Sequence, residues 1–186
     1  MTSTTNNLKQ SAIQSIVNNP CISNVENVYK YLINNVHDPK NASYKTASFF
    51  GYRYKKDKTK TALGRCNFSE KWVSLSIPFL EANLNKPKIL VNTMLHEIAH
   101  ALAYELYNCD SHGSVWKNLF LRLGGNGERC VNVRDINAIK SKYFLICTSC
   151  NYKKSVHRRL RLERSCRQCG GNTYNEKFKL KLIKNY

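Results

Sequence analysis

The feature that most constrains this chain is an apolar segment of about twenty residues that carries a His-Glu-x-x-His pattern. Residues 88–107 are rich in Ile, Leu, Met and Ala and contain no Gly or Pro, which predicts a largely buried helix. Helix positions i and i+4 share a face, so His96 and His100 can hold one metal ion. Glu97 lies beside them, where its carboxylate can accept a proton from water. Because burying three titratable groups without partners is costly, the pattern indicates a catalytic zinc site rather than an ordinary core helix.

A catalytic zinc site usually takes three protein ligands and leaves the fourth position for water, so a third ligand is needed. The metzincin pattern would place it six residues after His100, and that residue is Leu106, so this class is excluded. The best candidate is His112, which follows a turn-like break and precedes a second helix expected over 114–123. Glu128, in a Gly-rich stretch, is the alternative.

Four cysteines form a second metal-ligand pattern, C-x2-C-x15-C-x2-C, at Cys147, Cys150, Cys166 and Cys169. This spacing is typical of a structural zinc site, with flanking segments that predict short strands. The competing interpretation is a pair of disulfides. The first residues lack the apolar segment of a secretory signal, so we expect an intracellular, reducing compartment, which favours zinc over disulfides.

Positive charge is concentrated in the same region of the chain. Residues 143–186 carry 11 basic and two acidic side chains, a net +9 that is half of the +18 of the whole chain. Cations interleaved with aromatic rings are typical of surfaces that bind single-stranded or frayed DNA. A second basic run, at residues 55–60, is as compatible with a solvated turn. The expected nucleic-acid contacts are Tyr152, Lys153, Lys154, Arg158, Arg159, Arg161, Arg164 and Arg167.

Several blocks, in this order, together resemble a known family. They are Leu63-Gly64-Arg65-Cys66, the strand-like residues 72–76, Leu95-His96-Glu97-Ile98-Ala99-His100-Ala101, His112-Gly113-x-x-Trp116-Lys117 and the four cysteines. Over residues 44–182 the chain resembles the SprT-like zinc metalloproteases, the family of the Spartan-type DNA–protein crosslink proteases. The resemblance implies that His96, His100 and His112 bind zinc and that Glu97 is the catalytic base. It also implies a role in DNA repair, with proteins crosslinked to or bound on DNA as substrates, in the nucleus or wherever DNA is replicated.

The predicted fold is α+β: a zincin-like metalloprotease domain with a small antiparallel sheet and the HExxH helix, followed by a four-cysteine zinc ribbon. Strands of the sheet are expected at 47–54, 61–68 and 71–77. A further helix is expected over 135–142. The predicted organisation is a polar N-terminal tail or weak first helix in 1–22, the protease domain in 23–142 and a basic ribbon in 143–186. No apolar run is long enough to span a membrane, and we expect a monomer.

We therefore expect a DNA-associated zinc endopeptidase with two zinc ions per chain, one catalytic and one structural. The main alternative is a DNA-binding zinc protein whose HExxH site is structural or catalytically idle, although a purely structural site needs no base such as Glu97. A zinc hydrolase acting on small amides would leave the basic ribbon unexplained.

Overall fold

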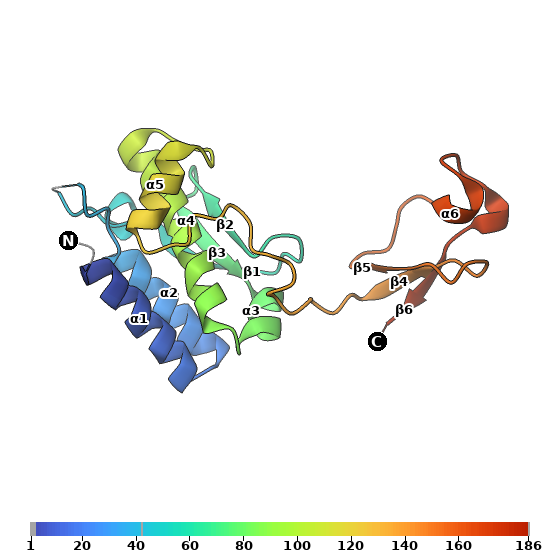
Figure 1. Cartoon of the computed structure of the whole chain (residues 1–186), viewed down its shortest axis with the longest axis horizontal. Coiled ribbons are helices and arrows are strands. Elements are labelled where there is room, and N and C mark those ends of the chain that lie inside the picture. The colour runs from blue at the N-terminus through green and yellow to red at the C-terminus, as the bar shows by residue number, and fades with distance from the viewer. Residues whose placement is uncertain (1–2, 42, 186) are drawn as a thin grey trace. The chain divides into compact units, whose positions relative to one another are not determined.

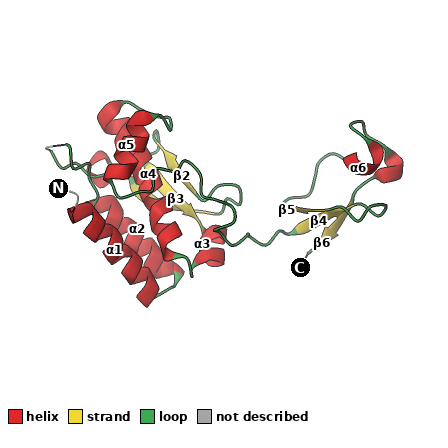
Figure 2. Cartoon of the chain, viewed as in Figure 1, coloured by secondary structure: helices red, strands yellow, loops and turns green. Residues whose placement is uncertain are grey.

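The computed structural model describes residues 3–41 and 43–185, which divide into two compact units between Ala138 and Ile139 (Figure 1). Helices and strands occur in both units, so the predicted α+β class is confirmed (Figure 2). None of the helices in the described part of the chain combines the length and hydropathy needed to cross a membrane. The first unit contains α1 (Ser3–Asn18), α2 (Ile22–Asn35), η1 (Ser48–Phe50), β1 (Arg53–Asp57), β2 (Gly64–Asn67), β3 (Trp72–Ser76), α3 (Ile77–Asn83), α4 (Pro87–Tyr107) and α5 (Ser114–Arg122).

The longest helix, α4, is the centre of the first unit. Pro87 occupies its first turn, where a missing N–H leaves no hydrogen bond broken, and Asn108 ends it in the left-handed conformation. Its apolar residues, such as Met94 and Ile98, are fully buried, because α1, α2 and α5 as well as β2 and β3 pack around it. The predicted buried helix is therefore confirmed, and the backbone that carries His96, Glu97 and His100 is held in place by packing.

The sheet of the first unit has the order β1-β3-β2. A short turn over 68–71 joins β2 to β3, and these two strands pair antiparallel as a hairpin. β1 pairs with the other edge of β3, where it runs parallel, with Arg53 opposite Trp72 and Asp57 opposite Ser76. The prediction of an antiparallel sheet is therefore wrong for β1, and the sheet is mixed. Within the described residues, the outer edge of β2 has no strand partner.

Of the two expectations for the first residues, a polar tail or a weak first helix, the helix is the one that forms, as α1. Ala12, Ile13 and Ile16 are buried at helical spacing against α2 and α4. Hydrogen bonds also fix this helix, since Lys9 Nζ donates to the Gly124 carbonyl over 2.6 Å. The burial of these apolar residues outweighs the polar composition of the segment.

After α5 the chain crosses the first unit without regular secondary structure, in a segment that we call the strap (residues 126–137). Asn side chains hold both of its ends. The Asn126 amide N–H donates to Asn92 Oδ1 over 3.1 Å, and the Asn137 amide N–H donates to Asn83 Oδ1 over 2.7 Å. The predicted helix over 135–142 is therefore wrong, because Asp135 and Asn137 form hydrogen bonds with Lys86 and with α3 instead of the helical pattern.

The second unit is a small three-stranded sheet with the order β5-β4-β6, antiparallel throughout. Its elements are β4 (Tyr143–Ile146), β5 (Lys153–Val156), α6 (Arg167–Gly170), η2 (Glu176–Phe178) and β6 (Lys181–Lys184). Among its described residues, the buried apolar and sulfur-bearing side chains are Leu145, Cys147 and Cys166. So small an apolar core needs additional stabilisation, such as a metal ion.

A buried ion pair connects the loop after α2 to α5 in the first unit. The Asp38 carboxylate is fully buried and accepts two hydrogen bonds from Arg122, from Nε at 2.8 Å and from Nη2 at 2.7 Å, and one from the Tyr107 hydroxyl. Burial by itself raises the pKa of Asp38, but the hydrogen bonds from Arg122 and Tyr107 more than offset it and lower the net pKa.

Asp38→Asn should therefore lower the unfolding free energy of the first unit by about 3–5 kcal/mol, because it leaves the Arg122 charge without its partner. Glu70→Gln is the control, since its pair with Lys55 is exposed and should contribute about 0–1 kcal/mol. Both tryptophans, Trp72 and Trp116, lie in this unit, so urea titrations followed by tryptophan fluorescence report on it.

The lowered pKa of Asp38 also sets how the difference in unfolding free energy between wild type and Asp38→Asn depends on pH. The stabilisation should be fully present above about pH 4, the ordinary pKa of an aspartate, and should be lost as the pH falls through the lower pKa of the folded protein. An Asp38→Asn protein as stable as wild type at pH 7 would contradict this role of the ion pair.

Candidate active site

Three histidine rings point their Nε2 atoms at one position in the first unit. His96 and His100 lie one turn apart on α4, and His112 comes from the loop between α4 and α5. The Nε2 atoms of His100 and His96 are 3.2 Å apart, those of His100 and His112 3.0 Å, and those of His112 and His96 3.1 Å. The atoms therefore form a nearly equilateral triangle.

This triangle fits a zinc ion. Nitrogen atoms about 2.0 Å from a tetrahedral zinc lie about 3.3 Å from one another, close to the separations found here. Burial, with the neighbouring histidines, lowers the pKa of His96 to about 4 and that of His100 to about 3, and the pKa of His112 is also lowered by burial and by the charge of Arg129. The imidazoles are therefore neutral near pH 7, as metal ligands must be.

The indole of Trp116, on α5, packs against all three imidazoles. Its ring centroid is 4.7 Å from that of His96, 5.2 Å from that of His100 and 4.6 Å from that of His112. Trp116 is buried, so it fixes the rings from the side of the core. The helix α5 thus brings together two ligands of α4 and one loop ligand.

The loop between the two helices explains how His112 reaches the other histidines. Asn108 adopts a left-handed conformation (φ 48°) that ends α4, and Gly113, in extended conformation, precedes the first turn of α5. Ser114 is the first residue of α5, within the helix predicted over 114–123. The alternative ligand Glu128 lines the same cavity, but the group of side chains placed to share one ion consists of the three histidines.

Glu97 lies next to the histidine triangle and is almost fully buried. Burial raises its pKa to about 8. Its carboxylate lies against the backbone of β2: a Cβ atom added to Gly64 would come within 2.8 Å of Glu97 Oε1 and 2.9 Å of the Ser74 carbonyl oxygen. Gly64 therefore leaves the space that the Glu97 side chain occupies, which is a physical reason for a glycine in this sequence block.

A cavity of about 470 Å³ opens beside these groups. Its floor is α4, with Thr93, His96 and Glu97; residues 62–64 line one side, and His112 and the strap line the rest. Of the strap residues that line it, the sequence singled out Glu128 alone, because the others belong to no motif and follow no periodicity. Those others are Arg129, Cys130, Val131, Val133 and Ile136.

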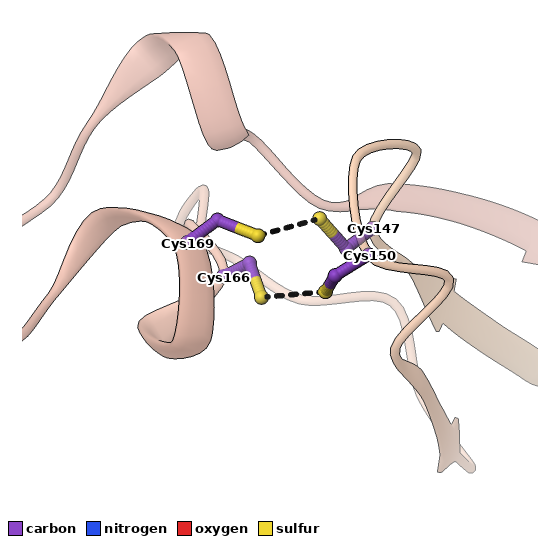
Figure 3. A group of neighbouring side chains, drawn as sticks. All are labelled: Cys147, Cys150, Cys166 and Cys169. Atoms are coloured by element: carbon purple, nitrogen blue, oxygen red, sulfur yellow. Dashed lines mark hydrogen bonds between the residues drawn. The ribbon is translucent and has the colours of Figure 1, made fainter.

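The four cysteines of the second unit also form a cluster (Figure 3). The Cys147 and Cys169 sulfurs are 3.9 Å apart, those of Cys150 and Cys166 are 3.6 Å apart, and all four Sγ atoms lie within 4.8 Å of one another. Sulfurs about 2.3 Å from a tetrahedral zinc lie about 3.8 Å apart, whereas disulfide sulfurs are separated by about 2.05 Å. A hydrogen bond from the Cys150 backbone amide lowers the pKa of the Cys147 thiol to about 6, whereas a hydrogen bond with the Cys150 side chain raises the pKa of the Cys169 thiol to about 12.

Part of the predicted nucleic-acid surface gathers around a second cavity, of about 630 Å³, in this unit. Tyr152, Lys154, Arg164 and Arg167 line it, together with Tyr174, which the sequence analysis did not include among the contacts. The remaining predicted contacts lie elsewhere: Lys153 Nζ is 3.7 Å from the centroid of the Phe144 ring, and Arg158, Arg159 and Arg161 do not line this cavity.

Comparison with known proteins gives one result. The model of the SprT-like family matches residues 33–135, a range that includes the three histidines, Glu97 and most of the strap and ends before the four cysteines. No curated protein and no solved structure matches the chain.

The two clusters lead us to expect two zinc ions per chain in metal analysis of protein kept reduced. His112→Ala should weaken binding at the histidine site by more than the roughly 10- to 100-fold that loss of an outer partner costs, and should leave the cysteine-bound ion in place. His37→Ala is the control, because His37 packs on Tyr44 in the same unit. Undiminished zinc affinity in His112→Ala would point to Glu128 as the third ligand, and disulfides between the four cysteines would contradict the second site.

Proposed function

The chain belongs to the SprT-like family, and on that premise we propose that it is a zinc-dependent endopeptidase with a zincin-like protease domain. The observation that carries this proposal is the triangle of three Nε2 atoms, 3.0–3.2 Å apart, with the buried Glu97 beside it in one cavity. His96, His100 and His112 would hold the zinc ion.

The arrangement favours a catalytic over a structural role for this site. Structural zinc sites are closed by four protein ligands, whereas catalytic sites use three and face a cavity. Three histidines converge here, and a cavity borders two of them together with Glu97. A zinc site without catalytic activity would not require the buried Glu97 carboxylate, nor the glycine at position 64 that leaves space for it.

A zinc ion held by the three histidines supplies a Lewis acid that polarises a peptide carbonyl and makes water more acidic. Glu97 then acts as general base and acid: its carboxylate accepts a proton from the attacking water and passes it to the amine that leaves. The Glu97 side chain is buried beside Gly64 and lines the same cavity as His96 and His112, so one carboxylate is placed for both proton transfers.

The shape of the cavity supports a polypeptide as substrate. β2, whose outer edge has no strand partner among the described residues, contributes Gly64 to the lining of the cavity, and the strap lines it as well. An extended peptide can pair its backbone with such a strand edge, which would bring a peptide bond past Glu97 and His96.

For the second unit we propose a zinc ribbon, closed by four cysteines, that binds DNA. Its cavity combines two partly exposed rings, Tyr152 and Tyr174, with Lys154, Arg164 and Arg167, and residues 143–186 carry a net +9. Aromatic faces stack on bases and cations neutralise phosphates, which suits single-stranded or frayed DNA. The substrates would then be proteins crosslinked to or bound on DNA, cut by a monomer in the compartment where DNA is replicated.

Glu97→Gln tests the protease proposal. The amide keeps the shape of the side chain but cannot accept the proton, so cleavage of an unstructured protein should fall by about 10²- to 10⁴-fold while both zinc ions remain bound. Glu81→Gln makes the same chemical change at an exposed position of α3 and should have no effect. Full activity in Glu97→Gln would exclude Glu97 as base, and an inactive wild-type protein, with and without DNA, would favour the idle-zinc alternative.

Charge reversal tests the DNA proposal. Reversing Lys154 and Arg164 to Glu should reduce both the affinity for single-stranded DNA and the steepness of its salt dependence, by about 0.7 in log–log slope for each lost phosphate contact. Reversing Lys181 and Lys184 to Glu changes the net charge equally, at exposed positions of β6 that do not line this cavity, and should cost less affinity. Equal losses in the two double variants, measured by fluorescence anisotropy, would show that net charge alone attracts DNA.

A further inference from the structure

The cavity at the histidine triangle has a second property, which is an apolar wall. Leu63 and Ala62 lie on the side of β2, and Val131, Val133 and Ile136 on the side of the strap. All five are at least partly exposed to solvent, and Val133 is 78% exposed. Apolar side chains from two separate segments thus face one cavity that also contains His96 and Glu97.

The strap holds its part of this wall in place. At one end Asn92 Nδ2 also donates to Asn126 Oδ1 over 3.2 Å, which completes a reciprocal pair with the backbone hydrogen bond described above. At the other end Asn137 Nδ2 donates to the Ala82 carbonyl over 2.7 Å, and Lys86 Nζ donates to the Asp135 carbonyl over 2.6 Å. Between these anchors, the valines and Ile136 have positions fixed relative to α4.

The charged residues of the cavity do not favour a charged ligand. Apart from Glu97, which the proposed mechanism uses, the acidic and basic residues that line it are Glu128 and Arg129. Both are exposed, and they contribute one negative and one positive charge at adjacent positions of the strap. A substrate side chain of either sign meets an attractive and a repulsive group. The apolar wall is therefore the feature of the cavity that can select among substrate side chains, by favouring apolar ones.

We propose that this cavity is a specificity pocket, which takes an apolar side chain, aliphatic or aromatic, of the substrate residue next to the cleaved bond. The proposal rests on the proposed protease function and adds to it the class of peptide that is cut. An apolar side chain would cover Val133 and the other four residues from water, and burial of such a group is worth roughly 10- to 100-fold in kcat/KM.

The test uses a series of peptides that differ only at one residue next to the cleaved bond, with mass spectrometry to locate the cut. The zinc-loaded full chain should cleave peptides with Leu or Phe there about 10- to 100-fold more efficiently than peptides with Glu or Lys. Val133→Lys should reverse part of this preference in favour of Glu, because it places a cation in the wall. Val17→Lys is the matched control: Val17 is also an exposed valine, on α1 and not among the residues that line the cavity, and its substitution should leave the preference unchanged.

The outcomes separate the pocket from the protease. Equal cleavage of all peptides by the wild-type protein, or an unchanged preference in Val133→Lys, would overturn the pocket and leave the protease function standing. If no peptide is cut, the same peptides are labelled with a fluorophore and their binding to the Glu97→Gln protein is measured by fluorescence anisotropy. This measurement tests the pocket without requiring cleavage. Tighter binding of the Leu and Phe peptides would support the pocket without the protease, and equal binding would overturn it.

Discussion

The structure of the first unit depends on one constraint: three imidazole nitrogens must meet within hydrogen-bonding distance at the surface of a helix that is otherwise buried. Polar groups in such a place are costly unless they share a partner, and a zinc ion is a partner that three neutral imidazoles can share. The surrounding elements meet this requirement together. Helix α5 brings Trp116 against the rings, the loop before it brings His112, and Gly64 leaves space for Glu97.

The two units use their metal-ligand clusters differently. The second cluster consists of four cysteines, enough ligands to surround a metal ion. The apolar core of this unit is so small that a bound metal would supply much of the unit's stability. The three histidines leave one side facing a cavity bordered by the edge of β2 and by the strap. The two units also differ in charge, since half of the net positive charge of the chain lies in its last 44 residues. Chemistry in one unit and attachment to DNA in the other is the division of labour that we propose.

Much of this could be predicted from the sequence because motifs with fixed spacing carry their own geometry. The i, i+4 spacing of His96 and His100 requires a helix, the C-x2-C pairs require tight turns, and the family model confirms the resemblance built on these blocks. The parts that could not be predicted depend on contacts between distant segments. Three buried apolar residues decide between the two expectations for the first segment, a tail or a helix, in favour of α1. β1 pairs parallel with β3, from which it is separated in sequence by β2, and asparagine side chains hold a strap that has no periodicity.

The central claim is that the histidine triangle and Glu97 hydrolyse peptide bonds when zinc is bound. It is tested most directly by incubating a peptide in ¹⁸O-enriched water with protein stripped of metal, and then with the same protein after zinc is returned. Mass spectrometry should find cleavage only after zinc is returned, with one ¹⁸O atom in each new carboxylate. Cleavage by the stripped protein, or none after both metal-ligand clusters are refilled, would contradict the account.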